Sequence, residues 1–265
     1  MFIDTFLFNG DWIVKLRLAY LYNFVDVFYV VEGRYTFSGL RKETLFTDTC
    51  RDWFEPYMDK IRFIISEKPA FDNAWQEETY QRNLVLNYIL DDKPPSMDYV
   101  LAVCDCDEIY DIDVISKVLP NFTGLAALDM SVHYYRFTHV LDERCSVPFM
   151  IHSSLLKREP ELSQLRATKL LNGERISCQV LLSAGWHFSF FMSIDDIQRK
   201  IQSYAHTEYN IEEIIDKNNI QQSIETCVDV LRRTKLKITI ADYSSLKFPP
   251  LFQTFHEELL LLQTQ

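Results

Sequence analysis

Short apolar segments alternate with amphipathic ones over the first 110 residues of the chain. The segments at residues 27–31 and 99–104 are continuous, which is typical of strands that are buried on both faces of a parallel sheet. The segments between them place apolar residues at helical spacing. This order predicts a doubly wound α/β sheet. The predicted strands cover residues 2–8, 27–31, 61–65 and 99–104, and the predicted helices cover residues 12–24 and 74–90.

The alternation weakens in the rest of the chain. Two consecutive apolar segments, residues 125–130 and 132–137, predict a hairpin or an antiparallel edge of the sheet. Ser193 begins a capping-box pattern, which predicts a helix, and residues 211–218 predict another. The Leu-rich segment 255–262 is amphipathic and is expected to pack on the domain.

Composition narrows the class of protein. A formal net charge of −11 over 265 residues argues against a nucleic-acid-binding or anionic-membrane surface. No apolar segment approaches the roughly 20 residues of a membrane-spanning helix, and the N-terminus lacks the basic start of a signal peptide. The six cysteines form no C-x-x-C pair, so we expect free thiols, a reducing compartment and no structural zinc. These features predict a cytoplasmic protein.

The apolar segment 99–104 ends at three carboxylates, Asp105, Asp107 and Glu108. Open α/β sheets bind ligands beyond the carboxyl ends of their strands, where these side chains would lie. Carboxylates this close repel one another unless a cation lies between them, and hard oxygen ligands suit Mg²⁺ or Mn²⁺ together with substrate phosphates. The pattern therefore predicts an Asp-x-Asp metal–diphosphate site. The alternative is a solvated acidic turn that caps the next helix, and Glu108 is expected to be such a cap.

Further motifs occur with these acids in a fixed order along about 210 residues. Together they resemble glycosyltransferase family 17, whose known member is the β-1,4-mannosyl-glycoprotein 4-β-N-acetylglucosaminyltransferase that adds the bisecting N-acetylglucosamine to N-glycans. Each motif is weak alone. They are Asp4–Asn9, Val30–Glu32 with Thr36–Gly39, Ala74–Trp75 with Gln81–Asn83, Asp105–Glu108, and Gly185–Ser189 followed by His206–Asn210.

The resemblance implies a GT-A type nucleotide-sugar-binding fold, a UDP-sugar donor (UDP-N-acetylglucosamine), a glycan or glycoconjugate acceptor, Mn²⁺ or Mg²⁺, and inversion at the anomeric carbon. We expect one glycosyltransferase domain over residues 1–265. Its nucleotide-sugar-binding half is residues 1–110, its acceptor-side half 111–192 and its C-terminal helical part 193–265. The family usually has Glu where this chain has Asp11, and the chain lacks the membrane anchor of the animal enzymes, which weakens the case for a Golgi glycoprotein acceptor.

The resemblance also implies roles for single residues. Asp107 is expected to coordinate the metal directly, and Asp105 to contact the metal or the donor ribose. His187 corresponds to a late histidine that GT-A enzymes commonly supply to the metal. Without the resemblance, a histidine in so apolar a segment would be read as a core residue with one hydrogen bond. Trp186 is expected either to stack on a sugar or to fill the core.

The donor site is expected to include Thr5, Glu32, Thr36, Gln81 and Arg82. Arginine suits phosphate because its planar guanidinium donates two parallel hydrogen bonds. The simpler interpretation of Arg82 is a surface ion pair with the residue four positions before it, Glu78.

An inverting transfer also needs a general base on the acceptor hydroxyl. By position the candidates lie between the acidic motif and His187, and spacing does not choose among them. Two other classes of function stay open: a metal-dependent phosphohydrolase that uses the three acids on water, and a non-catalytic carbohydrate-binding protein suggested by the many aromatic residues. The candidates for the base are Asp129, Asp142, Glu143, Glu161 and Glu174.

Overall fold

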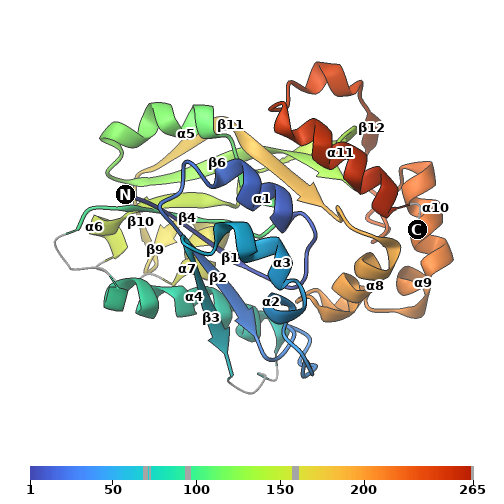
Figure 1. Ribbon diagram of the computed structural model, residues 1–265, viewed down its shortest axis with the longest axis horizontal. Coiled ribbons are helices and arrows are strands. Elements are labelled where there is room, and N and C mark those ends of the chain that lie inside the picture. Colours follow the sequence, from blue (N-terminus) through green and yellow to red (C-terminus); the bar gives the residue numbers. More distant parts are fainter. Residues whose placement is uncertain (68–70, 72, 93–96, 157–160, 264–265) are drawn as a thin grey trace.

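The computed structural model describes the whole chain except residues 68–70, 72, 93–96, 157–160 and 264–265. A ten-stranded sheet runs through the molecule, in the order β12-β7-β6-β8-β4-β1-β2-β3, with β11 beside β6 and β5 beside β11 (Figure 1). The strands β1 (Phe2–Leu7), β2 (Val27–Gly33), β3 (Ile61–Ser66) and β4 (Val100–Val103) are parallel to one another. This half confirms the α/β sheet predicted from the first 110 residues.

The other half of the sheet is mostly antiparallel. The strand β8 pairs antiparallel with β4 and β6, β7 with β6, and β12 with β7, whereas β11 runs parallel to β6 and antiparallel to β5. These strands are β5 (Glu108–Tyr110), β6 (Leu125–Tyr134), β7 (His139–Cys145), β8 (Phe149–His152), β11 (Cys178–Ser189) and β12 (Ile238–Ile240), and a separate pair is formed by β9 (Leu170–Leu171) and β10 (Glu174–Arg175). The antiparallel edge that the sequence predicts is confirmed.

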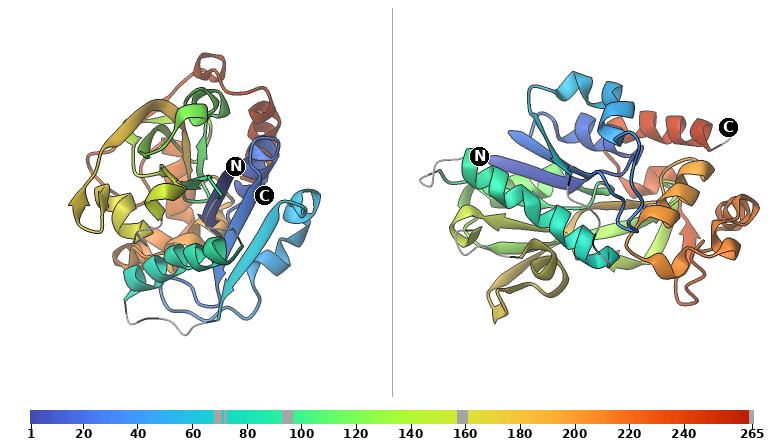
Figure 2. Two further views of the ribbon diagram at one scale, coloured as in Figure 1. Left: turned by 90° about the vertical axis from the view of Figure 1, so that its left-hand side faces the viewer. Right: turned by 90° about the horizontal axis from the view of Figure 1, so that it is seen from below.

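Helices cover both faces of the parallel half (Figure 2). Alternate residues of β1 serve the two faces: Phe2 and Phe6 belong to the core beneath α1 (Val14–Leu21), and Ile3 and Leu7 to the core beneath α4 (Ala74–Asp92). This period of two explains why β1 has apolar residues on both of its faces. The strand is buried from both sides.

The remaining helices connect strands or form the C-terminal part. Shorter helices are α2 (Phe46–Thr49), α3 (Arg51–Phe54), α5 (Ile112–Val118), α6 (Ser153–Leu156) and α7 (Leu162–Thr168). The C-terminal ones are α8 (Ile194–Ser203), α9 (Glu212–Ile215), α10 (Lys217–Thr226) and α11 (Leu251–Leu262). Single 3₁₀ turns are η1 (Glu55–Tyr57), η2 (Leu119–Asn121), η3 (Thr207–Tyr209) and η4 (Tyr243–Leu246).

Three local predictions can be compared directly with the structure. The hairpin predicted at residues 125–137 is wrong, because β6 continues through Ser131 and the chain turns only at Tyr135, which has a φ of 65°. The cap at Ser193 is confirmed, since its hydroxyl accepts the N–H of Asp196 at 3.2 Å. The C-terminal helix α11 packs on the core through Phe252, Phe255 and Leu259, as predicted. No helix in the described part of the chain has the length and apolar character needed to cross a membrane.

Candidate functional site

The loop between β4 and β5 carries the three predicted acids, and a buried arginine fixes its shape. Arg17 on α1 pairs with Asp4 on β1, with Nη2 and Oδ1 2.6 Å apart and both side chains fully buried. The other terminal nitrogen, Nη1, donates to the backbone carbonyls of Asp105 and Glu108 at 3.0 and 2.6 Å. Because a guanidinium has five N–H groups in a rigid fork, one side chain can hold both β1 and the acidic loop.

Asp105 lies between two arginines. Its Oδ1 accepts from Arg82 on α4 at 2.8 Å, and its Oδ2 accepts from Arg166 on α7 at 2.7 Å. Burial raises the pKa of Asp105, but Arg166 and Arg82 outweigh burial and hold the pKa well below its usual range. Arg82 also donates to Glu78 at 2.7 Å. The predicted ion pair between Arg82 and Glu78 is therefore present, but it is largely buried rather than on the surface, and Arg82 also reaches the acidic loop.

Asp107 lies among a lysine, a histidine and a second aspartate. Its Oδ2 accepts from Nζ of Lys200 on α8 at 2.9 Å, and the same ammonium donates to Asp11 at 2.7 Å. Its Oδ1 is 3.6 Å from Nε2 of His187 on β11. Burial lowers the pKa of His187, but Asp107, Cys145 and Glu108 together outweigh burial and the pKa rises to about 10. When the ring gives up its proton to bind a metal, this carboxylate and imidazole become a donor pair that Mn²⁺ accepts, so Asp107 and His187 fit the predicted metal site.

Two glycines bring these side chains together. Gly10 has a φ of 80°, and a Cβ there would lie 2.8 Å from the ring of Phe46, so the turn that places Asp11 requires glycine. At Gly185 in β11 a Cβ would lie 2.3 Å from the carbonyl oxygen of Ile109. The close approach of β11 to β5 sets His187 opposite Glu108 in the register.

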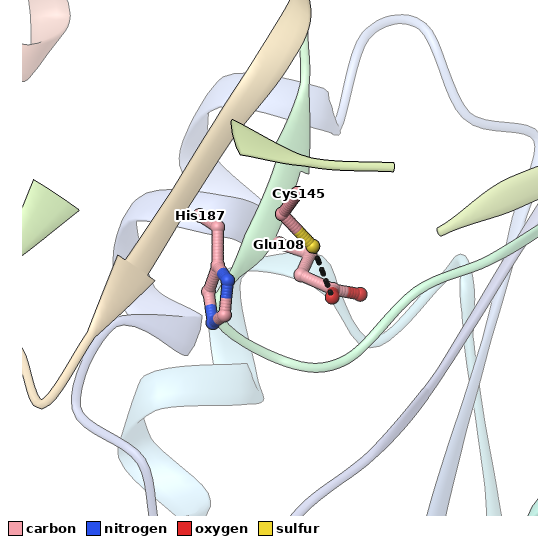
Figure 3. A group of neighbouring side chains, drawn as sticks. All are labelled: Glu108, Cys145 and His187. Carbon is pink, nitrogen blue, oxygen red and sulfur yellow. Dashed lines mark hydrogen bonds between the residues drawn. The ribbon is translucent and has the colours of Figure 1, made fainter. Parts of the chain in front are cut away.

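Glu108 does not cap a helix, so that prediction is wrong. The residue begins β5, its Oε2 accepts the N–H of Asp105 at 2.6 Å, and its Oε1 accepts from Arg166 at 2.6 Å. The helix that follows is capped by Asp111 instead. Glu108 also lies beside Cys145 and His187, and ligand atoms of the three residues are within 4.8 Å of one another (Figure 3). Arg166 already neutralises the Glu108 carboxylate, so its main role is to hold the acidic loop.

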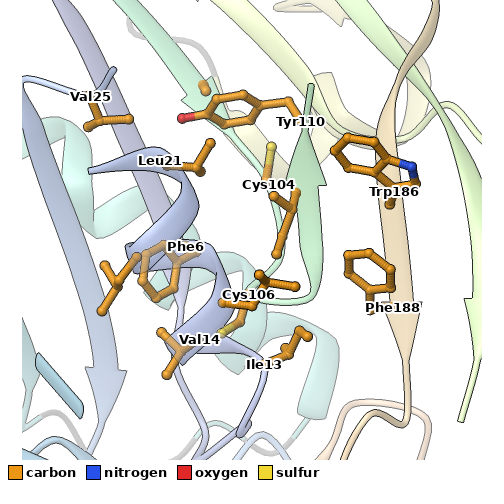
Figure 4. Packing of buried hydrophobic residues seen from close by; sticks show 14 of the residues in the cluster. Phe6, Ile13, Val14, Leu21, Val25, Cys104, Cys106, Tyr110, Trp186 and Phe188 are labelled. Carbon is orange, nitrogen blue, oxygen red and sulfur yellow. The ribbon is translucent and has the colours of Figure 1, made fainter. Parts of the chain in front are cut away.

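A cavity of about 390 Å³ opens where these elements meet, at the carboxyl ends of β1 and β4. This volume is within the range of small-molecule sites. Among its lining residues, those that carry charge or an aromatic ring are Asp11, Phe37, Trp75, Glu78, Arg82, Asp105, Asp107, Arg166, His187, Phe190, Lys200, Tyr204, His206 and Arg233. Trp186 is not among them: its indole is 8% exposed and packs in the core near Phe188 (Figure 4).

Four of the residues predicted for the donor do not line this cavity, although Arg82 and Asp105 do. Thr5 is buried and donates to the carbonyl of Tyr29. Glu32 is fully buried, and its carboxylate accepts from Lys42 and from the N–H groups of Phe46 and Thr47 at 2.8 Å each. Gln81 donates to Glu77 and Tyr35, and Thr36 accepts the N–H of Leu40 within its own turn. Their contacts are structural, and donor binding by them stays a prediction.

The five predicted candidates for the general base also lie outside the lining of this cavity. Asp129 is paired with Arg144 at 2.6 Å, and Asp142 and Glu143 are exposed on β7. The carboxylates that line the cavity are instead Asp11, Glu78, Asp105 and Asp107. The sequence analysis placed no function on Asp11, Arg166, Lys200 or Trp75. Only the motif resemblance around residues 9–11 and 74–75 could have pointed to two of them.

Comparisons with known proteins give one extensive match. The family model of glycosyltransferase family 17 matches residues 2–235. No curated protein matches the sequence. Among solved structures, a mannosyltransferase from Pyrobaculum calidifontis in complex with GDP-Man and Mn²⁺ has 10% identity and a TM-score of 0.45, over 98% of this chain and 79% of that one. A 4-diphosphocytidyl-2C-methyl-D-erythritol synthase has 11% identity and a TM-score of 0.42, over 69% and 88%.

Proposed function

The chain belongs to glycosyltransferase family 17, and from this premise we propose that it transfers N-acetylglucosamine from UDP-N-acetylglucosamine to a glycan hydroxyl. The transfer inverts the anomeric carbon and depends on Mn²⁺ or Mg²⁺. One observation carries the proposal: Arg82, Arg166, Asp107 and His187 come from four separate elements and line the same cavity. A nucleoside diphosphate and its metal need this combination of cations, carboxylate and imidazole.

Each of these residues has a distinct task in the proposal. Asp107 and His187 would hold the divalent ion, which stabilises the charge that develops on the departing diphosphate. Arg82 and Arg166 bind the phosphate oxygens, because a guanidinium matches a phosphate in shape and charge. Both arginines now donate to Asp105, so Asp105 orients them toward the cavity.

The acceptor hydroxyl must lose its proton during the transfer. Outside the Asp105–Asp107 motif, the cavity offers the carboxylates of Asp11 and Glu78 for this step. Lys200 donates to Asp11, and Arg82 donates to Glu78. Replacing each by its amide, Asp11→Asn and Glu78→Gln, distinguishes them, since the base variant loses kcat while its affinity for UDP is kept.

The function is tested by the release of UDP from UDP-N-acetylglucosamine, with and without a set of oligosaccharide acceptors, and by mass spectrometry of the products. We expect release that requires both an acceptor and a divalent cation, and that is lost in Asp107→Asn. The matched control is Asp142→Asn, an exposed aspartate outside the cavity, which should be fully active. UDP release at the same rate without an acceptor would indicate hydrolysis and contradict the proposal. The same assay with GDP-sugars tests whether the enzyme prefers a uridine nucleotide.

A further inference from the structure

The outer end of the cavity has an exposed aromatic wall. Trp75 at the start of α4 is 47% exposed, a large fraction for an indole, and it lines the cavity. Its ring contacts that of His206, with centroids 4.6 Å apart and planes at 86°. The two residues are far apart in the sequence, so the fold brings together segments that follow β3 and α8. Aromatic surface that stays exposed to water in a cavity costs free energy, and such surface often marks the place where a ligand binds.

Trp75 shares one helix face with the predicted phosphate-binding arginine. Trp75, Glu78 and Arg82 are spaced three and four residues apart on α4, and all three line the cavity. Seven residues of helix separate Trp75 from Arg82 by about 10 Å along the axis. In a nucleoside diphosphate, the ribose and the base extend a similar distance from the phosphates. A ligand whose phosphates contact Arg82 therefore presents its far end to Trp75.

Polar contacts fix the backbone at Trp75 and the ring of His206. The backbone N–H of Trp75 donates to the side chain of Asn73 at 2.8 Å, which fixes the first turn of α4. Nδ1 of His206 is 2.8 Å from a carboxylate oxygen of Glu208. Phe37, from the turn after β2, also lines the cavity. The wall is therefore preformed by α4 and by the segment that follows α8.

We propose that Trp75 and His206 form the stacking platform for the nucleobase of the donor. The inference rests on the proposed function and adds the part of the site that recognises the nucleoside. A nucleobase fits better than an acceptor sugar, because Trp75 and the arginine that faces the phosphates belong to the same helix, α4. Arg233, Phe190 and Val147, which line the cavity from other elements than α4, are left for the acceptor.

The test compares the affinities of Trp75→Ala for UDP and for inorganic pyrophosphate, both with Mn²⁺, by calorimetry. Stacking of one base typically changes affinity by about 5- to 100-fold. We expect UDP binding to weaken by that factor and pyrophosphate binding to stay within twofold of wild type. Trp75→Phe should keep most of the UDP affinity while reducing the quenching of tryptophan fluorescence by UDP. Tyr88→Ala, an aromatic residue on the same helix that is 43% exposed and outside the cavity lining, is the control.

Each outcome decides the question. Unchanged UDP affinity in Trp75→Ala would overturn the platform, and would leave the proposed function in place if wild-type protein binds UDP with Mn²⁺. An equal loss of UDP and pyrophosphate affinity would also overturn it, because the residue would then act on the phosphates or on folding. A wild-type protein that binds neither probe would refute the proposed function itself, and the platform with it.

Discussion

Replacing Lys200 by methionine removes a cation from the cavity and keeps a long unbranched side chain. The ammonium lies 2.7 Å from Asp11 and 2.9 Å from Asp107. Burial lowers the pKa of Lys200, but Asp107 and Asp11 outweigh burial and raise the pKa above its usual value, so the side chain is charged at neutral pH. Because Asp107 is the proposed metal ligand, the ammonium and a divalent ion compete for one carboxylate. Removing Lys200 should therefore strengthen the binding of Mn²⁺ alone.

The size of this effect follows from the geometry. Lys200 occupies Oδ2 of Asp107, and His187 lies beside Oδ1, where the metal would bind. With about 5 Å between the ammonium and the ion, and the dielectric constant of water, about 80, Coulomb's law gives about 1.7 kcal/mol of repulsion between charges of one and two. That is roughly a 15-fold gain in Mn²⁺ affinity when Lys200 is removed. Affinity for UDP without metal should fall at the same time, since one cation fewer faces the phosphates.

The assay is calorimetric titration of wild type and Lys200→Met with MnCl₂ alone, and with UDP in EDTA. Lys217→Met, an exposed lysine paired with Asp195 outside the cavity, is the control and should bind both ligands like wild type. Thermal unfolding of the same preparations reports any loss of structure. Unchanged or weaker Mn²⁺ binding by Lys200→Met, with an unaltered melting temperature, would refute the competition between lysine and metal. A purely structural lysine would lower both affinities together.

Three further predictions concern neighbouring groups. Arg82→Ala should weaken UDP binding by roughly 1.5–3 kcal/mol, as expected for a charge-assisted hydrogen bond, and an affinity within twofold of wild type would exclude a phosphate contact. Arg17→Met leaves Asp4 buried and unpaired and should cost about 3–5 kcal/mol in urea denaturation. The double variant Asp4→Leu/Arg17→Met should be more stable than Arg17→Met, because no buried charge is left unpaired, but it should not recover the Mn²⁺-dependent affinity for UDP. Recovery of both stability and affinity would contradict the role of Arg17 in shaping the acidic loop. Burial lowers the pKa of His133 to about 4, below the unfolded value of about 6.5, so the unfolded chain binds more protons between these pH values. Protonation of His133 should therefore lower the free energy of unfolding by about 2 kcal/mol as the pH falls from 7 to 5. If His133→Gln loses as much stability over the same pH range, other groups are responsible.

The sequence predicts the parallel half of the fold well, because its strands are buried on both faces. Residues 99–104 have no polar interruption, and two of the acids that follow them, Asp105 and Asp107, line the cavity, as expected from the chain direction. The strand β6 was divided in the prediction because Ser131 interrupts its apolar pattern. In the structure Ser131 is partly exposed, and its hydroxyl lies 3.0 Å from His133 within the same strand. A polar residue in a long strand does not by itself end that strand.

The charged residues of the site show what sequence spacing cannot supply. Arg166 and Lys200 lie on helices and have the spacing of ordinary surface residues, so only the long-range packing of α7 and α8 reveals that they reach the acids. Glu32 shows the opposite case. A carboxylate just past the end of the predicted strand 27–31 suggested ligand contact, but its partners are Lys42 and the first N–H groups of α2. Local pattern does not distinguish a ligand contact from a helix cap made by a distant residue.

The position of Mn²⁺ in crystals grown with UDP tests the central claim most directly, because anomalous scattering locates the ion independently of the protein. We expect one peak within coordination distance of the Asp107 carboxylate and of Nε2 of His187, with the diphosphate between that ion and the guanidinium groups of Arg82 and Arg166. A peak elsewhere in the molecule, or UDP bound in the cavity with both residues free of the ion, would contradict the account.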